Sequence, residues 1–152
     1  MPTSLTEEMK TLLQAYNAAS VATVNDDGTP AVSPKATFVI VDDNTIAFGD
    51  IRSPNTIKNL KARPATELNF IDVLTRRALR VTGTAKIIEK NSAAATPLLP
   101  LFEELWAPYL DVMRHFVLVN ISRTQLILSP AYDTGASEDD LRDTNLKKLS
   151  SI

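Results

Sequence analysis

Short apolar runs separated by turn residues occupy most of the chain between residues 20 and 129. Six runs are visible, at residues 20–25, 31–41, 45–50, 65–72, 76–89 and 116–129. Runs of this length and composition are typical of antiparallel strands joined by short turns. Helical segments do not alternate with them, which argues against a doubly wound parallel sheet. We therefore expect a mainly β fold, a small antiparallel β-barrel with peripheral helices.

Particular residues refine the expected strands. Asp27-Gly28 supplies a tight turn after the first run. Pro34 stands inside the second run and lacks a backbone N–H, so this point is predicted to be a sheet edge or a bulge. The last run, 116–129, is apolar enough to predict burial on both of its faces.

Helices are expected at residues 4–19, 54–62, 92–115 and 137–150. Ser4 followed by Glu7 has the form of a capping box, and Ser137 precedes three acidic residues that suit a helix start. Three prolines interrupt the third segment. We expect a single domain over 1–152, with its core at about 20–130 and the tail helix packed on the surface or on a partner.

Composition excludes several classes of function. The net charge of −2 gives no general basic field for nucleic acid, and the absence of Cys excludes disulfides and thiolate chemistry. No spacing of metal ligands is present, so no metal is expected. No apolar run is long enough for a membrane span, and the N-terminal residues lack signal-peptide character, so we expect a cytoplasmic protein.

The stretch "FGDIRSPNTIKNLKARP", from Phe48 to Pro64, gathers groups that suit an anion. Ser53 is a predicted N-cap and is followed by proline at the first helical position, which leaves the N–H groups of Asn55 and Thr56 free. Such a helix start attracts phosphate, and Lys58 lies one turn later on the same face. Arg52 can approach from the loop. The alternative interpretation is a capped surface helix with solvated lysines.

The order of these parts resembles the flavin-binding split β-barrel family, which includes pyridoxamine 5′-phosphate oxidase. The similar parts are "VSPKATFVIVDDNTIAFGD", the helix with "NLKARP", and "RRALRVTG", which looks like the family's Arg-Gln-Val-Arg strand followed by Gly. The resemblance is clearest from Ser20 to Ile88 and weaker up to about residue 135.

The resemblance implies a split β-barrel of the FMN-binding type and a homodimer with FMN in a cleft between its subunits. By this similarity, the ring and ribityl chain lie along one strand, a second strand forms the next wall, the helix start meets the phosphate, and two arginines fall on the Arg-rich strand. The implied cofactor-binding residues are Ser33, Pro34, Lys35 and Ala36 along the ring and ribityl chain; Phe48, Gly49 and Asp50 on the second strand; Ser53, Asn55, Thr56 and Lys58 at the phosphate; and Arg77 and Arg80 on the Arg-rich strand.

Three departures from the family pattern bear on the cofactor and the substrate, and the first leaves phosphate binding to Lys35, Lys58 and the backbone. The oxidase carries adjacent Arg and Lys where this chain has Asn55 and Thr56, and Ala78 replaces a glutamine of the Arg-rich strand. The oxidase's C-terminal Arg-Leu motif is not visible. These differences argue against vitamin B6 as the substrate.

The resemblance implies a flavoprotein oxidoreductase that moves electrons between FMN and either NAD(P)H or a small organic substrate. A non-catalytic flavin-binding or ligand-sensing protein, a deazaflavin protein and a cofactor-free interaction module remain as alternatives. Catalytic residues are unknown. His115 is the single histidine and fits either a proton donor or a capping residue, while Trp106 and Tyr132 fit either cofactor contacts or ordinary packing.

Overall fold

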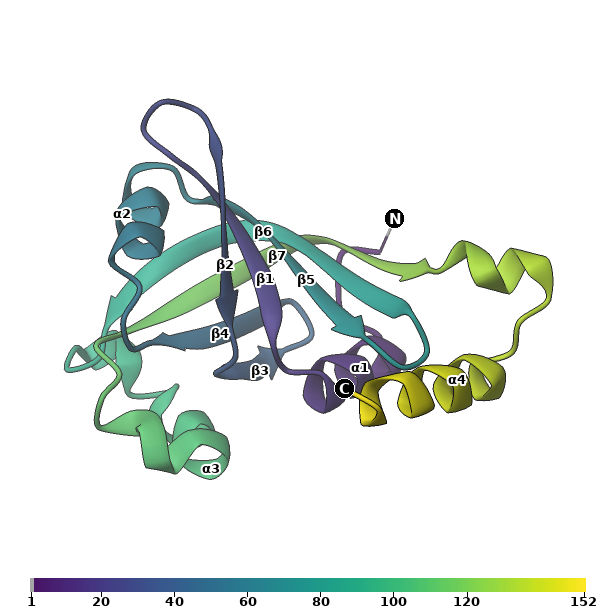
Figure 1. Cartoon of the computed structure of the whole chain (residues 1–152). Coiled ribbons are helices and arrows are strands. Elements are labelled where there is room, and N and C mark those ends of the chain that lie inside the picture. The colour runs from purple at the N-terminus through teal and green to yellow at the C-terminus, as the bar shows by residue number, and fades with distance from the viewer. Residues whose placement is uncertain (1) are drawn as a thin grey trace.

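Seven strands form one antiparallel sheet in the order β2-β1-β5-β6-β7-β4-β3 in a computed structural model that describes residues 2–152 (Figure 1). Met1, which the expected domain included, lies outside the described residues. The strands are β1 Ala19–Val24, β2 Pro30–Lys35, β3 Phe38–Asp42, β4 Thr45–Asp50, β5 Ala65–Asp72, β6 Arg77–Glu89 and β7 His115–Leu128. The mainly β, antiparallel fold is thus confirmed. Over residues 2–152 the outer strands β2 and β3 do not pair with each other, so the sheet is open and its closure into a barrel stays a prediction.

The run expected as one strand over 31–41 is two strands, so that prediction was wrong. The chain turns at Ala36 and Thr37 between β2 and β3. The Thr37 hydroxyl donates to the Gly49 carbonyl at 2.9 Å, which fixes the turn against β4. Pro34 lies on β2, the edge strand, as its missing N–H predicts.

Burial on both faces of the last strand holds for only part of its length. Residues 116–119 of β7 are buried or nearly so, because β4 lies on one side of them and α3 (Leu99–Leu110) covers one face. From Asn120 onward most side chains are half-buried or exposed. In this second half Ile121 and Leu126 pack against the core, whereas Leu128 is 56% exposed, so the predicted burial on both faces is confined to the start of the strand.

The helices are α1 Glu7–Ala15, α2 Pro54–Ala62, α3 Leu99–Leu110 and α4 Glu138–Ser150, with single 3₁₀ turns η1 Ala93–Ala95 and η2 Pro130–Thr134. The capping box predicted at Ser4 and Glu7 is wrong, because Thr6 is the N-cap and accepts a hydrogen bond from the Met9 N–H. Ser137 does form a capping box, with Asp140. α3 is kinked at Trp106, two residues before a proline inside the helix.

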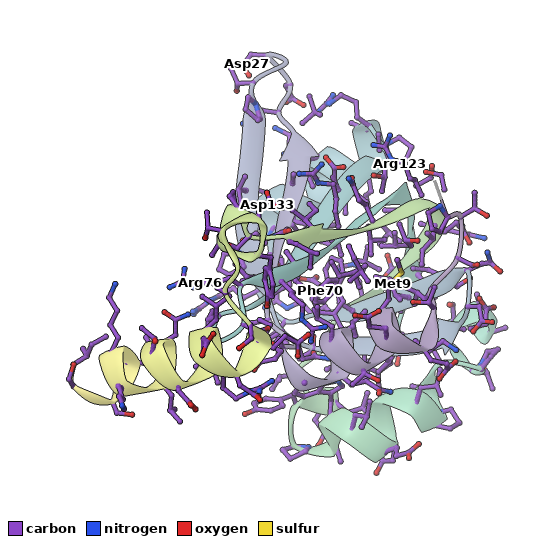
Figure 2. All side chains as sticks on the ribbon, turned by 90° about the vertical axis from the view of Figure 1, so that its right-hand side faces the viewer. Met9, Asp27, Phe70, Arg76, Arg123 and Asp133 are labelled. Atoms are coloured by element: carbon purple, nitrogen blue, oxygen red, sulfur yellow. The ribbon has the colours of Figure 1, made fainter. Side chains whose placement is uncertain are left out.

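Two packed clusters form the core. The larger lies under α1 and α2 and includes Met9 and Phe70, which point into the interior in Figure 2. The smaller lies under α3, where the Phe102 and Phe116 rings stack with centroids 4.4 Å apart. Helices α2 and α3 lie at one end of the sheet, and α1 and α4 lie at the other (Figure 1). The stretch that gathers anion-binding groups is at the α2–α3 end.

Candidate cofactor-binding site

The β1–β2 hairpin projects from the sheet beside α2, with Asp27 at its tip (Figures 1 and 2). Asn59 of α2 is only 1% exposed, and its Nδ2 donates to Thr23 Oγ1 and Asn25 Oδ1, both at 3.0 Å. A buried amide that is satisfied by two partners on the hairpin ties the hairpin to the helix. We call these contacts of Asn59 with Thr23 and Asn25 the seam; it holds β2 beside the first turn of α2.

The first turn of α2 has free backbone donors. Ser53 occupies the N-cap position, as predicted, but its side chain forms no capping hydrogen bond. Pro54 takes the first helical position. The N–H groups of Asn55 and Thr56 have no acceptor within the helix, because the first four residues of any α-helix lack one. These donors and the positive end of the helix dipole favour an anion at this point.

A hollow of about 320 Å³ lies at this helix start. We call it the helix hollow; its lining residues are Thr23, Ala31, Val32, Ser33, Lys35, Arg52, Ser53, Pro54, Asn55 and Thr56. Two cations, Lys35 and Arg52, line it together with Asn55 and Thr56, and neither cation forms an ion pair within residues 2–152. Backbone donors with two cations are a suitable donor set for phosphate.

A larger hollow of about 910 Å³, the main cleft, shares Ser33, Lys35, Arg52 and Ser53 with the helix hollow. Residues 33–37 and Gly49 lie on the sheet side of the main cleft. Its remaining lining residues are Ile51, Trp106, Tyr109, Asp111, Val112, Met113 and Arg114. The two hollows are therefore joined along a shared wall.

Glycine at position 49 leaves room in the main cleft for the side chain of Met113. A Cβ atom there would displace the side chain of Met113, which is buried over the strand. The absence of a side chain lets Met113 pack directly against β4. The cleft thus gains a polarisable apolar group beside the sheet.

Lys35 stands where the two hollows meet. Its ammonium donates a hydrogen bond to Ser33 Oγ. Burial lowers the pKa of Lys35 below its ordinary value, and the charge of Asp50 acts in the opposite direction. A phosphate beside this ammonium would favour its charged form.

Asp50 and His115 lie beside a third hollow, of about 690 Å³, which we call the histidine hollow. Asp50 is 3% exposed, and its Oδ2 lies 2.8 Å from His115 Nδ1. The other ring nitrogen lies 3.4 Å from Glu89 Oε1. Asp50, predicted to line the flavin, therefore lines the histidine hollow and not the main cleft.

Four other predicted residues lie away from the main cleft and the helix hollow. Phe48 is fully buried and packs on Phe38, so its side chain is part of the core. Lys58 pairs with Asp26 at 2.8 Å. Arg77 pairs with Glu8 and Glu138, and Arg80 with Glu67. The predicted residues that the structure does bring together are Ser33, Pro34, Lys35, Ala36, Gly49, Ser53, Asn55 and Thr56.

Several lining residues carried no signal in the sequence. Thr37, Met113 and Arg114 come from turns whose position depends on the folded sheet. Trp106 lines the main cleft and donates from Nε1 to the Phe38 carbonyl at 2.9 Å, so it both packs and faces the cleft. Tyr132, in contrast, does not line the main cleft. Its hydroxyl donates a hydrogen bond to the Thr75 carbonyl, which joins η2 to the β5–β6 turn.

The described residues 2–152 contain no helix long and apolar enough to cross a membrane. In the same part of the chain, no three His, Cys, Asp or Glu side chains are grouped so as to hold a metal ion.

One family model, that of pyridoxamine 5′-phosphate oxidase, matches residues 5–127 of the chain. The chain belongs to the pyridoxamine 5′-phosphate oxidase family. No curated protein matches this family member.

Solved structures share the fold. HupZ from group A Streptococcus is 25% identical with a TM-score of 0.69, covering 82% of this chain and 95% of its own. An F420 reductase is also 25% identical with a TM-score of 0.61, covering 80% and 98%. The heme storage protein HutZ from Vibrio cholerae is 19% identical with a TM-score of 0.59, covering 80% and 92%, and shows the fold alone.

Proposed function

We propose that this member of the pyridoxamine 5′-phosphate oxidase family binds FMN and acts as an FMN-dependent oxidoreductase. Its partner in electron transfer would be NAD(P)H or a small organic substrate. One observation carries the proposal: a hollow at a helix start, lined by donors and cations that suit phosphate, shares four lining residues with a cleft that can hold a ring system.

The donor set of the helix hollow suits the FMN phosphate. The N–H groups of Asn55 and Thr56, the free hydroxyl of Ser53 and the cations of Lys35 and Arg52 would hold it. Lys58 would join them only by leaving Asp26, its partner at 2.8 Å. In this proposal the positive charge that binds the phosphate therefore comes mainly from Lys35 and Arg52.

The main cleft suits the isoalloxazine ring. Pro34, Ala36 and Gly49 would pack along one side of the ring, and Trp106 and Met113 would limit the space on another. Bound flavin supplies the redox chemistry by accepting and returning a hydride or electrons. The chain's own residues position the cofactor and exclude water from it.

Two other cofactors can be weighed against the residues present. The similar F420 reductase favours a deazaflavin as the second candidate, since such a ring would use the same cleft. Heme, which the name of HutZ suggests, would commonly need an imidazole ligand. The single histidine lies beside Asp50 and does not line the main cleft. A flavin that is bound without turnover remains the functional alternative.

The proposal includes a homodimer with two flavins at its interface. Arg77 and Arg80 lie away from the main cleft of their own chain, so each would serve the cleft of the other subunit. Leu146, Leu149 and Ile152 expose apolar side chains on and after α4, which supports a partner surface there.

Mass spectrometry of the cofactor released from purified protein tests the proposal directly. FMN is the expected mass, with a flavin absorption spectrum in the intact protein. A colourless protein that binds neither FMN nor F420 on addition would overturn it. Oxidation of NADH or NADPH by the FMN-loaded protein then separates an oxidoreductase from a flavin-binding protein without turnover.

A further inference from the structure

The histidine hollow lies next to the proposed flavin site but has no part in holding the ring. It shares Ile51, Arg52, Ser53 and Arg114 with the main cleft. Its other lining residues are Asp50, Pro54, Ile57, Lys58, Lys61, Ala62 and His115. Its volume of about 690 Å³ is within the range of small-molecule sites.

The charges around the histidine hollow are unbalanced. Four Lys and Arg side chains line it, and of these four only Lys58 has an ion-pair partner in the described chain, the exposed Asp26. Arg52, Lys61 and Arg114 form no ion pair within residues 2–152. Asp50 is the single acidic lining residue, and its Oδ2 is already taken by His115. The hollow therefore presents an excess of positive charge.

Asp50 adds an independent sign of a ligand. Its Oδ1 is buried and accepts no hydrogen bond within the described chain. Buried polar atoms are rarely left without a partner, because each one costs free energy. A ligand hydroxyl or amide, or a water held with that ligand, would supply the missing donor.

From this combination we infer that the histidine hollow binds an anionic organic molecule, one with a phosphate or carboxylate, an apolar part and a hydrogen-bond donor. The cations would hold the anion, Ile57 and Pro54 would contact the apolar part, and Asp50 would accept the hydrogen bond. Because segment 51–53 borders both hollows, this ligand would lie beside the flavin. Resting on the proposed function, we assign the hollow to the molecule that exchanges electrons with FMN.

Calorimetric titration of inorganic pyrophosphate into protein without FMN tests the anion site by itself. We expect saturable binding that weakens with salt, and Lys61→Glu should weaken it at least about 10-fold, as loss of a charge-assisted contact implies. Lys147→Glu, an exposed lysine on α4, is the matched control and should bind as the wild type does. No saturable binding, or equal loss in the two variants, overturns the inference.

FMN titration separates this inference from the proposed function. Lys61 lines neither the main cleft nor the helix hollow, so Lys61→Glu should keep the wild-type affinity for FMN. If FMN fails to bind while pyrophosphate binds as expected, the anion site in the histidine hollow is supported and its assignment to electron transfer with FMN is wrong. Competition experiments then identify the class of ligand. If pyrophosphate displaces bound NADPH, the ligand is a phosphorylated nucleotide; if pyrophosphate displaces only bound citrate, the ligand is an organic acid.

Discussion

Lys35 is one of two cations, with Arg52, that line both the helix hollow and the main cleft, so the proposed cofactor site depends strongly on it. Lys35→Ala should weaken FMN about 10- to 100-fold, from roughly 1.5–3 kcal/mol for a charge-assisted hydrogen bond. Riboflavin, which lacks the phosphate, should lose much less. Fluorescence titration of apoprotein with each flavin measures the difference.

Lys58→Ala is the matched control for Lys35→Ala. The ammonium of Lys58 pairs with Asp26, so its removal should leave the preference for FMN over riboflavin unchanged. An FMN-selective loss in Lys58→Ala would instead mean that this lysine leaves Asp26 to reach the phosphate, as the sequence alone predicts.

Ser53 separates helix capping from ligand binding. Its side chain forms no capping hydrogen bond, so Ser53→Ala should change the free energy of unfolding by less than about 0.5 kcal/mol instead of the ~1 kcal/mol of a lost cap. If the free hydroxyl contacts phosphate, the same change should weaken FMN about 10-fold. Urea denaturation and flavin titration of the one variant check both values; a large loss of stability with normal FMN binding contradicts the assignment.

At the scale of elements, the seam between the β1–β2 hairpin and α2 positions the site. Asn59→Ala would remove the hydrogen bond that the buried Thr23 hydroxyl accepts from Asn59, and it should cost about 1–3 kcal/mol of unfolding free energy. Because β2 carries Lys35, FMN affinity should fall as well. Asn55→Ala, which removes an exposed contact at 3.4 Å, should cost much less. Equal costs in urea denaturation would show that the seam has no special role.

The turn between β5 and β6 makes stability depend on pH. Burial raises the pKa of Asp72, but hydrogen bonds from Thr75, Tyr16 and Leu74 outweigh it and hold that pKa below its ordinary value. Asp72 therefore stabilises the fold above the unfolded-state pKa of about 3.9 and loses this effect as the pH falls through its folded-state pKa.

Asp72→Asn tests this turn. The variant should lose about 1–3 kcal/mol of unfolding free energy at pH 7. The amide nitrogen of Asn cannot accept the hydrogen bond that Asp72 Oδ2 accepts from the Thr75 hydroxyl, and the charge that strengthens the bonds from the Leu74 and Thr75 N–H groups is lost. The difference from wild type should stay constant down to about pH 5 and shrink below about pH 4. Urea denaturation at several pH values measures it. A difference that does not change with pH would assign the stability to the shape of the side chain alone.

Local signals explain which elements the sequence predicts well. β4, α2 and β5 have the predicted bounds, since turn residues and Pro54 mark their ends. The break at 36–37 was missed because apolar residues continue on both sides of it. In the site, residues 33–36 and 53–56 were predictable as parts of one strand and one helix start. The pair of Lys58 with Asp26 was not, because it depends on how the hairpin folds back onto α2.

For the whole molecule, α4 bears on the number of subunits. Its C-terminal end extends away from the rest of the chain (Figure 2), and Leu146 and Leu149 are about half exposed there. We expect a dimer in sedimentation velocity, and Leu146→Asp with Leu149→Asp should shift it toward monomer and weaken FMN. Lys148→Asp puts an acid on the same helix and should leave the dimer intact. A monomer with unchanged FMN affinity would contradict the shared site.

The edge position of β2 has a consequence for how copies of this chain avoid uncontrolled stacking. Pro30, Val32 and Pro34 alternate along this strand, so their backbone nitrogens face the same side, the side away from β1 where proline is tolerated. Only Val32 carries a hydrogen there. A strand that approached this edge from solvent would find one backbone N–H donor at these three positions instead of three. The β2 edge is therefore a poor template for fibre growth, and assembly is left to other surfaces of the molecule.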